Sequence, residues 1–178
     1  MNLIGLVIAV ALLAFVHESL HAATAALFGE YGSFRVHWYG FEVIYRTAVE
    51  LRAGIHWALI AGLPNLVTVL LGYLLLTGRS VFARIAPLAG RSLAYWATLI
   101  FLLADPLNIA VGPFLYGGDA GGIAHGLGLN QYFLQALAFG VFLWNRELVA
   151  SRLLPAFGVV TSHPLFRPWL SGGPAAGE

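Results

Sequence analysis

The sequence predicts an all-α polytopic membrane protein with about four transmembrane helices, a membrane-associated β-hairpin after the first and a broken Pro/Gly segment before the fourth. The first observation is composition. Of the 178 residues 60% are apolar and 10% are charged, against about 45–50% and about 25% in soluble globular proteins. The mean hydropathy is +0.82. The second observation is that the apolar residues gather in four stretches, each near the ~20 residues that cross a bilayer.

The first apolar stretch runs from about Leu3 to Phe28 and predicts a membrane helix. Only Asn2 is polar before it and no basic residue precedes it, so a cleaved signal peptide is not expected. The stretch is also longer than the apolar core of a signal peptide. We therefore expect a helix that is retained.

A β-hairpin is predicted directly after this helix, at residues 34–46 (FRVHWYGFEVIYR). Strand-forming apolar residues recur at every second position in both halves of this segment. Tyr39 and Gly40 occupy the position of the turn. The many aromatic side chains favour a place at the membrane interface or dipping into it.

The other three apolar stretches cover about 55–76, 88–104 and 123–144. Between the last two lies a broken segment at 105–122 (DPLNIAVGPFLYGGDAGG), which is apolar yet interrupted by two prolines and five glycines. Non-helical backbone at membrane depth is tolerated where it is buried in protein or lines a cavity. This broken segment is therefore a place to expect a functional site.

Charge and cysteine content restrict the partners and the location. The net charge of +1 gives no reason to expect nucleic acid, and the absence of cysteine excludes disulfides and cysteine metal ligands. We expect one membrane core at 1–150 and a tail at 151–178 that ends in disorder. Arginine is in excess after the second and fourth stretches, so the positive-inside rule predicts that both termini are cytoplasmic. These arginines are Arg79, Arg84, Arg91, Arg146, Arg152 and Arg167. The membrane is expected to be the plasma or inner membrane of the cell.

The strongest chemical signal lies inside the first apolar stretch, where HESLH at 17–21 fits the pattern H-E-x-x-H. Positions i and i+4 share a helix face, so His17 and His21 are placed to bind one metal ion. Glu18 lies one step round the helix, where it can take a proton from a metal-activated water. A chance match is the simpler alternative. The metal site is favoured because ionisable groups inside a membrane helix are costly and usually functional.

Two histidines leave a zinc site one protein ligand short. Asp119 is favoured, because it directly follows GPFLYGG within the broken segment and leads into the fourth stretch, where glycines let backbones approach closely. Asp105 precedes a proline and fits ordinary turn chemistry, while His125 lies about 240° round a helix from Asp119. His56 opens the second stretch and is typical of an interfacial residue. Whether Asp105 or His125 replaces Asp119 stays open at this point.

Three segments, in order, resemble motifs of the site-2 protease family of intramembrane zinc metalloproteases. HESLH is similar to the HExxH of that family, and AGLPNL at 61–66 resembles the glycine- and asparagine-containing motif of the next core helix. NIAVGPFLYGGDAGG at 108–122 resembles the asparagine–proline–aspartate–glycine motif. The hairpin also lies where the family carries β-structure. The resemblance covers about Leu3 to Leu148 and implies a minimal membrane core without extra soluble domains.

The resemblance implies a zinc site made by the two histidines and Asp119, with Glu18 as the general base. It also implies that Asn65 and Asn108 bind substrate backbone or the developing oxyanion, although an interhelical hydrogen bond is equally compatible with Asn65. The chain departs from the family pattern in two places. Asn108 and Asp119 are eleven residues apart and Ala120 follows the aspartate, while a proline stands next to Asn65.

The expected function is hydrolysis of a peptide bond in or near a transmembrane segment, with Zn²⁺ as cofactor. The expected partners are a transmembrane or membrane-anchored protein substrate and the lipid bilayer, and no nucleic acid; a homo-oligomer or a regulatory membrane partner is left open. An edge of the hairpin would hold the unwound substrate by strand addition. The alternatives are a non-catalytic metal-binding membrane protein, such as a pseudo-protease that binds membrane helices, or a membrane zinc hydrolase of a non-peptide amide. The intact Glu18 argues against a non-catalytic site.

Overall fold

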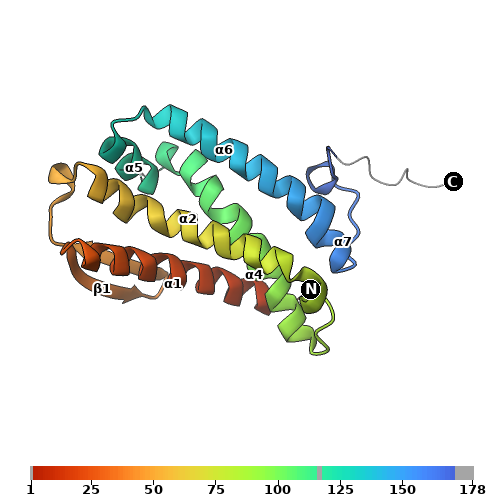
Figure 1. Ribbon diagram of the computed structural model, residues 1–178. Coiled ribbons are helices and arrows are strands. Elements are labelled where there is room, and N and C mark those ends of the chain that lie inside the picture. The colour runs from red at the N-terminus through yellow and green to blue at the C-terminus, as the bar shows by residue number, and fades with distance from the viewer. Residues whose placement is uncertain (1, 116–117, 171–178) are drawn as a thin grey trace.

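The computed structural model of the chain describes residues 2–115 and 118–170, and these residues are mostly helical (Figure 1). In chain order the elements are α1 (Leu3–Leu27), β1 (Tyr31–His37), β2 (Gly40–Tyr45), η1 (Val49–Leu51), α2 (Ile55–Thr77), α3 (Arg79–Phe82), α4 (Leu88–Val111), η2 (Gly112–Phe114), α5 (Asp119–Leu127), α6 (Gln131–Leu148), η3 (Val149–Leu153), α7 (Leu154–Ala156) and η4 (Pro164–Phe166).

The long helices form a bundle in which α4 is central and contacts α1, α2 and α6 (Figure 1). The short helix α5 packs against α2, and β2 packs against α1. Within residues 2–115 and 118–170, three helical segments are long and apolar enough to cross a membrane: α1, α2 and the run Leu88–Phe114. The outer face of α1 is aliphatic, and Leu3 and Ile4 are 71% and 69% exposed. These features indicate a membrane protein, because lipid is the solvent that such a face requires.

The predicted hairpin is confirmed as a two-stranded antiparallel sheet. It begins three residues earlier than predicted, at Tyr31, and turns between His37 and Gly40. Phe34 and Phe41 of the two strands pack edge-on against Phe15 of α1, with ring centroids 6.4 and 5.5 Å from it. These aromatic contacts hold the hairpin alongside α1.

The broken segment starts later than predicted, because α4 continues through Pro106 to Val111. A proline inside a helix removes one N–H and frees the carbonyl four residues earlier. Here that carbonyl belongs to Leu102, and the Asn145 side chain of α6 donates to it through Nδ2 at 2.7 Å. The helix therefore continues past Pro106 because a side chain of a neighbouring helix hydrogen-bonds to the freed carbonyl. Residues 116–117 of the broken segment lie outside the described residues.

The fourth apolar stretch, predicted at 123–144, is divided between two helices. Gly128 has φ +64° and closes α5 in a left-handed cap, a conformation that glycine adopts without strain. The Asn130 side chain then caps α6 by accepting from the Tyr132 N–H at 2.8 Å. Among the described residues, α6 is not one of the three helices that meet the length and apolarity needed for a span. The count of four spans stays a prediction.

The close packing of α5 on α2 depends on Gly126. A Cβ at this position would lie 2.7 Å from the backbone N of Ala58 and 2.7 Å from the carbonyl O of Gly54. Any other residue would push the two helices apart, because such distances are far shorter than van der Waals contact. This contact seats the last turn of α5 on the start of α2, and Asp119 lies at the opposite end of the same short helix.

After α6 the chain folds back over the end of the bundle. The Arg146 guanidinium lies 3.9 Å from the centre of the Trp169 ring and donates to the carbonyls of Pro164 and Leu165. The Glu147 carboxylate accepts from the backbone N–H groups of Trp169 and Leu170. The predicted boundary between core and tail, at 150 and 151, falls inside η3. The predicted disordered end at 171–178 lies outside the described residues.

Candidate metal centre

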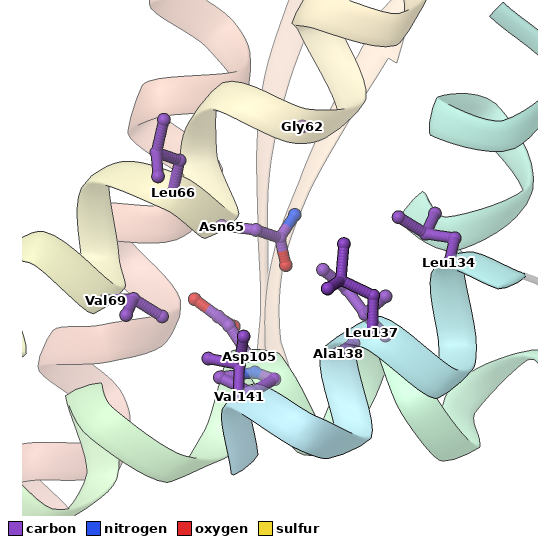
Figure 2. Close-up of a pocket in the computed structure, with 11 residues that line it drawn as sticks. Gly62, Asn65, Leu66, Val69, Asp105, Leu134, Leu137, Ala138 and Val141 are labelled. Carbon is purple, nitrogen blue, oxygen red and sulfur yellow. The ribbon is translucent and has the colours of Figure 1, made fainter. Parts of the chain in front are cut away.

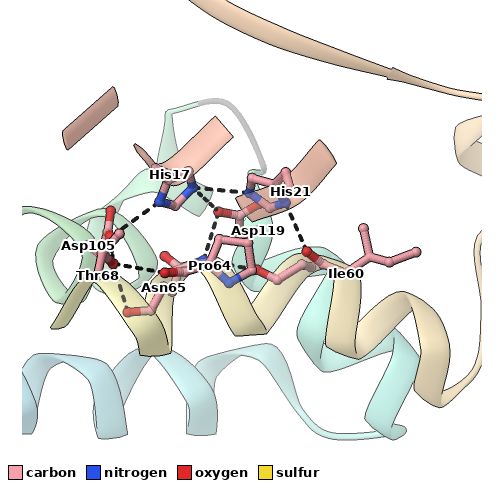
Figure 3. Close-up of polar contacts among 9 residues, drawn as sticks. His17, His21, Ile60, Pro64, Asn65, Thr68, Asp105 and Asp119 are labelled. Atoms are coloured by element: carbon pink, nitrogen blue, oxygen red, sulfur yellow. Dashed lines mark hydrogen bonds and ion pairs between the residues drawn. The ribbon is translucent and has the colours of Figure 1, made fainter. Parts of the chain in front are cut away.

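The two histidines of HESLH lie on one face of α1, as their spacing predicts. Their Nε2 atoms are 3.0 Å apart (Figure 3), and the rings meet edge to face with centroids 4.8 Å apart. His21 is buried, with 4% of its surface exposed. Two imidazole nitrogens therefore converge on one point inside the bundle.

Asp119, the first residue of α5, brings a carboxylate to the same point. Its Oδ2 lies 3.2 Å from His17 Nε2 and its Oδ1 lies 3.3 Å from His21 Nε2. Ligands held about 2.0–2.1 Å from zinc in a tetrahedron are about 3.3 Å from one another. Among the described residues, these three form the cluster of histidine and acidic side chains whose donor atoms could share an ion. The donor set and its spacing fit zinc, with the fourth position left for water.

The other nitrogen of each histidine is also held. His17 Nδ1 donates to Asp105 Oδ2 at 3.2 Å, and His21 Nδ1 donates to the carbonyl O of Ile60 at 2.8 Å (Figure 3). Both acceptors require a proton on Nδ1, so the partners assign the tautomer in which Nε2 carries the lone pair. A hydrogen bond of this kind fixes the ring and raises the basicity of the ligating nitrogen.

The Ile60 carbonyl is free to accept from His21 because of Pro64. In an uninterrupted helix the N–H of residue 64 would bond to this carbonyl. Pro64 has no N–H, and it lies inside α2. The proline of AGLPNL, one of the departures from the family pattern, therefore releases the acceptor that orients a histidine of the centre.

Asp105 lies behind His17 and does not join the ligand set. It is 5% exposed, and besides His17 it accepts from the Thr68 hydroxyl of α2. His125, also on α5, lines a cavity beside the centre rather than the point where the Nε2 atoms converge. His56 is at the start of α2, where it packs against Phe28. Of the candidates for third ligand, the structure brings Asp119 to the histidines.

Asn65 supports the aspartate. Its Nδ2 donates to Asp119 Oδ2 at 2.9 Å and to the Ala61 carbonyl at 2.9 Å. Both amide hydrogens are therefore engaged, and the observed position of Asn65 is that of a residue that orients Asp119. A contact of this amide with substrate, as the resemblance implies, would require it to release one of these bonds.

A cavity of about 480 Å³ adjoins the centre on the side of the hairpin. Glu18 and Asn108 line it together with His17 and Asp119, and the hairpin turn at Tyr39 covers it. The backbone of Val43 in β2 lies beside the Glu18 carboxylate. Glu18 therefore faces the space in front of the converging ligand atoms without belonging to the ligand set, which is the arrangement that a general base needs.

A second cavity of about 520 Å³ adjoins the centre at His21 and Asp119 and extends to Tyr45 and Arg52. The Arg52 guanidinium lies 4.6 Å from the centre of the Tyr45 ring. Burial raises the pKa of the Tyr45 hydroxyl above its ordinary value, and the charges of Asp119 and Glu18 add to this. Tyr45 therefore stays protonated and presents a neutral polar wall. The centre lies between two cavities, one of which contains the candidate base.

Sequence reasoning missed the residues behind the ligands. Thr68 was not singled out, and Asp105 was considered only as a ligand or as an ordinary turn residue. One usable signal existed for Ile60, because a proline inside an apolar helical stretch marks a free carbonyl four residues earlier. The partner of that carbonyl depends on how α1 packs on α2, which the sequence does not state.

Comparison of the chain with protein-family models, with curated protein sequences and with solved structures found no match in any of the three. The chemistry of the centre is therefore inferred from its own geometry. That geometry consists of two imidazole nitrogens and one carboxylate at mutual distances of 3.0–3.3 Å, with a carboxylic acid residue beside them.

Proposed function

We propose that this chain is an intramembrane zinc metalloprotease of the site-2 protease type, which hydrolyses a peptide bond in or near a transmembrane segment of its substrate. The observation that carries the proposal is the convergence of His17, His21 and Asp119 beside Glu18, inside a bundle of apolar helices. Each of these ionisable groups costs free energy within an apolar bundle unless a partner compensates it. A divalent ion provides that compensation.

The roles of the residues follow from their positions. His17, His21 and Asp119 hold the ion, and Asp105, Ile60 and Asn65 orient them. When bound, zinc supplies the acidity that lets a water lose its proton near neutral pH. Glu18 accepts that proton as the water oxygen attacks the carbonyl carbon, and then delivers it to the nitrogen of the leaving amine as the C–N bond breaks.

The membrane arrangement is part of the proposal. We assign α6 as a fourth membrane helix beside α4, and place both termini in the cytoplasm and the hairpin at the membrane interface. Trp38 at the hairpin turn is 96% exposed, which suits an aromatic residue at the interface. The substrate is a membrane-spanning or membrane-anchored protein, since the cavity with Glu18 opens among apolar helices.

The outer edge of β2 is the proposed place where substrate binds. The backbone of Val43 lies beside Glu18 at this edge, so an extended peptide paired with the Val43 N–H would pass in front of the candidate base. Strand addition would replace the hydrogen bonds that a substrate helix loses when it unwinds. Val43→Pro removes this N–H and is expected to weaken substrate capture and cleavage, while Val36→Pro, on the other strand, serves as the control. Unchanged capture and cleavage by the Val43→Pro protein would contradict the assignment.

The test of the proposal separates metal binding from hydrolysis. Purified wild-type protein, Glu18→Gln and His17→Ala are assayed for zinc by mass spectrometry, and for cleavage of tagged single-span proteins in proteoliposomes. The wild type is expected to bind about one zinc and to cleave. Glu18→Gln should keep the zinc and lose cleavage by ~10²-fold or more, because a general base contributes about 10²–10⁴-fold. His17→Ala should lose both. Cleavage by Glu18→Gln at the wild-type rate would refute the mechanism.

A further inference from the structure

A third cavity, of about 220 Å³, lies between α2, α4 and α6 (Figure 2). Asn65 and Asp105 form its floor, and the same two residues back the metal centre from the other side. Its remaining lining is almost entirely aliphatic: Leu66, Val69, Ile109, Leu134, Leu137 and Val141. An aliphatic cavity of about 150 Å³ holds a benzene molecule. This cavity therefore has room for a somewhat larger apolar group.

One buried hydrogen-bond acceptor lies behind this almost wholly apolar lining. The Asn65 amide projects from α2 into the space between α2 and α6, toward Leu137 (Figure 2). Its orientation is fixed, because Nδ2 must face the two oxygens of Ala61 and Asp119 to which it donates. Oδ1 therefore points the other way. Asn65 is 4% exposed, and Oδ1 has no hydrogen-bond partner among the described residues.

The chemistry of a ligand follows from these walls. Leu66 and Leu137 at the rim are 55% and 58% exposed, so the cavity opens on the apolar outer surface of the bundle and a ligand enters from hydrocarbon. A charged group would be costly to bring along that route. The acceptor left without a partner beside the cavity is Asn65 Oδ1, whereas Asp105 Oδ2 already accepts from His17 and Thr68. The polar end of a ligand must therefore be a neutral donor, because a buried acceptor gains from a donor and is repelled by another acceptor.

We propose that this cavity binds a small membrane-soluble alcohol, with its apolar chain against Leu66 and Leu137 and its hydroxyl donating to Asn65 Oδ1. This binding goes beyond the proposed protease function and needs neither a metal ion nor substrate. The bound hydroxyl would share the Asn65 amide with Asp119. The cavity is thus a ligand site one residue away from the metal centre.

The experiment uses the full chain in lipid nanodiscs, after chelation of metal, with two photoreactive probes. One is a diazirine analogue of 1-octanol, and the other is its methyl ether, which has the same chain without a donor. Mass spectrometry maps the labelled residues. We expect the alcohol to label α2 and α6 at the cavity, with competition by 1-octanol, and the ether to bind about tenfold more weakly for the loss of one hydrogen bond. Equal labelling by the two probes would overturn the proposal.

Variants locate the site. Ala138 is 8% exposed and lines the cavity, so Ala138→Leu should fill it and remove labelling, as should Val69→Phe from the opposite wall. Gly140→Leu adds the same side chain to α6, at a position where a Cβ meets no atom within 4 Å, and should label like the wild type. Asn65→Leu should bind both probes equally. Labelling that persists in both filled variants, or a preference for alcohol that survives Asn65→Leu, would refute the assignment. Cleavage is not measured, so failure here is distinct from failure of the protease proposal.

Discussion

The two histidines of the centre occupy equivalent positions on α1 but are supported in different ways. His17 is backed by the carboxylate of Asp105, which the Thr68 hydroxyl holds in turn. His21 is backed by the backbone carbonyl of Ile60, which Pro64 leaves free. One support is a side chain with a negative charge, and the other is a neutral group produced by the interruption of a helix.

The difference shows two ways in which a helical bundle can orient a ligand. A buried carboxylate strengthens the basicity of its histidine, but it adds a charge that must itself be compensated. A carbonyl freed by proline adds no charge and is as rigid as the helix that carries it. The second support is therefore removed by restoring a regular helix, not by deleting a side chain.

The largest loss of zinc affinity is expected when Asp119, the carboxylate that contacts both histidines, is removed. Asp119→Ala should lower zinc affinity well beyond the ~10–100-fold that follows loss of an outer-shell partner, because two imidazoles alone do not complete the site. His125→Ala, on the same helix, is the matched control and should keep its zinc. Metal analysis of the purified proteins measures both. If Asp119→Ala retained zinc and His125→Ala lost it, then His125 rather than Asp119 would be the third ligand.

A smaller effect is expected when the His17 support alone is broken. Asp105→Ala should weaken zinc binding by about 10–100-fold, and Asp105→Asn should weaken it less, since the amide oxygen still accepts from Nδ1. Thr68→Val, which removes only the second partner of the carboxylate, should weaken it least. Competition with a fluorescent zinc chelator gives the ranking. An Asp105→Ala protein with wild-type affinity would show that His17 needs no support.

The smallest loss of zinc affinity is expected when the support of His21 is changed. Here zinc affinity and thermal stability should move in opposite directions. Pro64→Ala supplies an N–H that competes with His21 for the Ile60 carbonyl, so zinc affinity should fall by a few-fold, within the ~10-fold lower limit for outer-shell changes. The melting temperature should rise, because alanine favours a helix interior over proline by about 3 kcal/mol.

Pro106→Ala is the matched control for this change. The new N–H there competes with Asn145 for the Leu102 carbonyl, so the contact between α4 and α6 should weaken while zinc affinity stays unchanged. A fall in zinc affinity for Pro106→Ala as large as that for Pro64→Ala would mean that helix regularity, rather than the Ile60 carbonyl, decides the affinity.

Local patterns in the sequence predicted the parts of the molecule that depend on local geometry. The alternation at 34–46 predicted the hairpin, and the i, i+4 spacing of HESLH placed two histidines on one face. Patterns of this kind describe a segment by itself. Asp119 was the favoured third ligand from its place directly after GPFLYGG in the broken segment, and the structure brings it to the histidines.

The remaining features arise from contacts between distant segments. The helix α4 continues through Pro106 because Asn145, 39 positions further along the chain, satisfies the freed carbonyl. Thr68 and Asp105 are joined across two helices, and no spacing in the sequence links them. The division of the fourth apolar stretch was visible in principle at Gly128 and Asn130, which are residues typical of helix ends.

The fold-back over Arg146 and Glu147 sets a practical limit on shortening the protein. Both side chains are buried at the end of an apolar bundle, at 6% and 7% exposure. They form an ion pair with each other at 2.9 Å, and residues 164–170 supply further hydrogen-bond partners to both. A chain cut before Pro164 would leave an arginine and a glutamate without these partners at an apolar surface, which favours aggregation in detergent. A fluorescent reporter fused after residue 178 leaves the segment in place. A single symmetrical peak of its fluorescence in size-exclusion chromatography would then indicate an intact bundle.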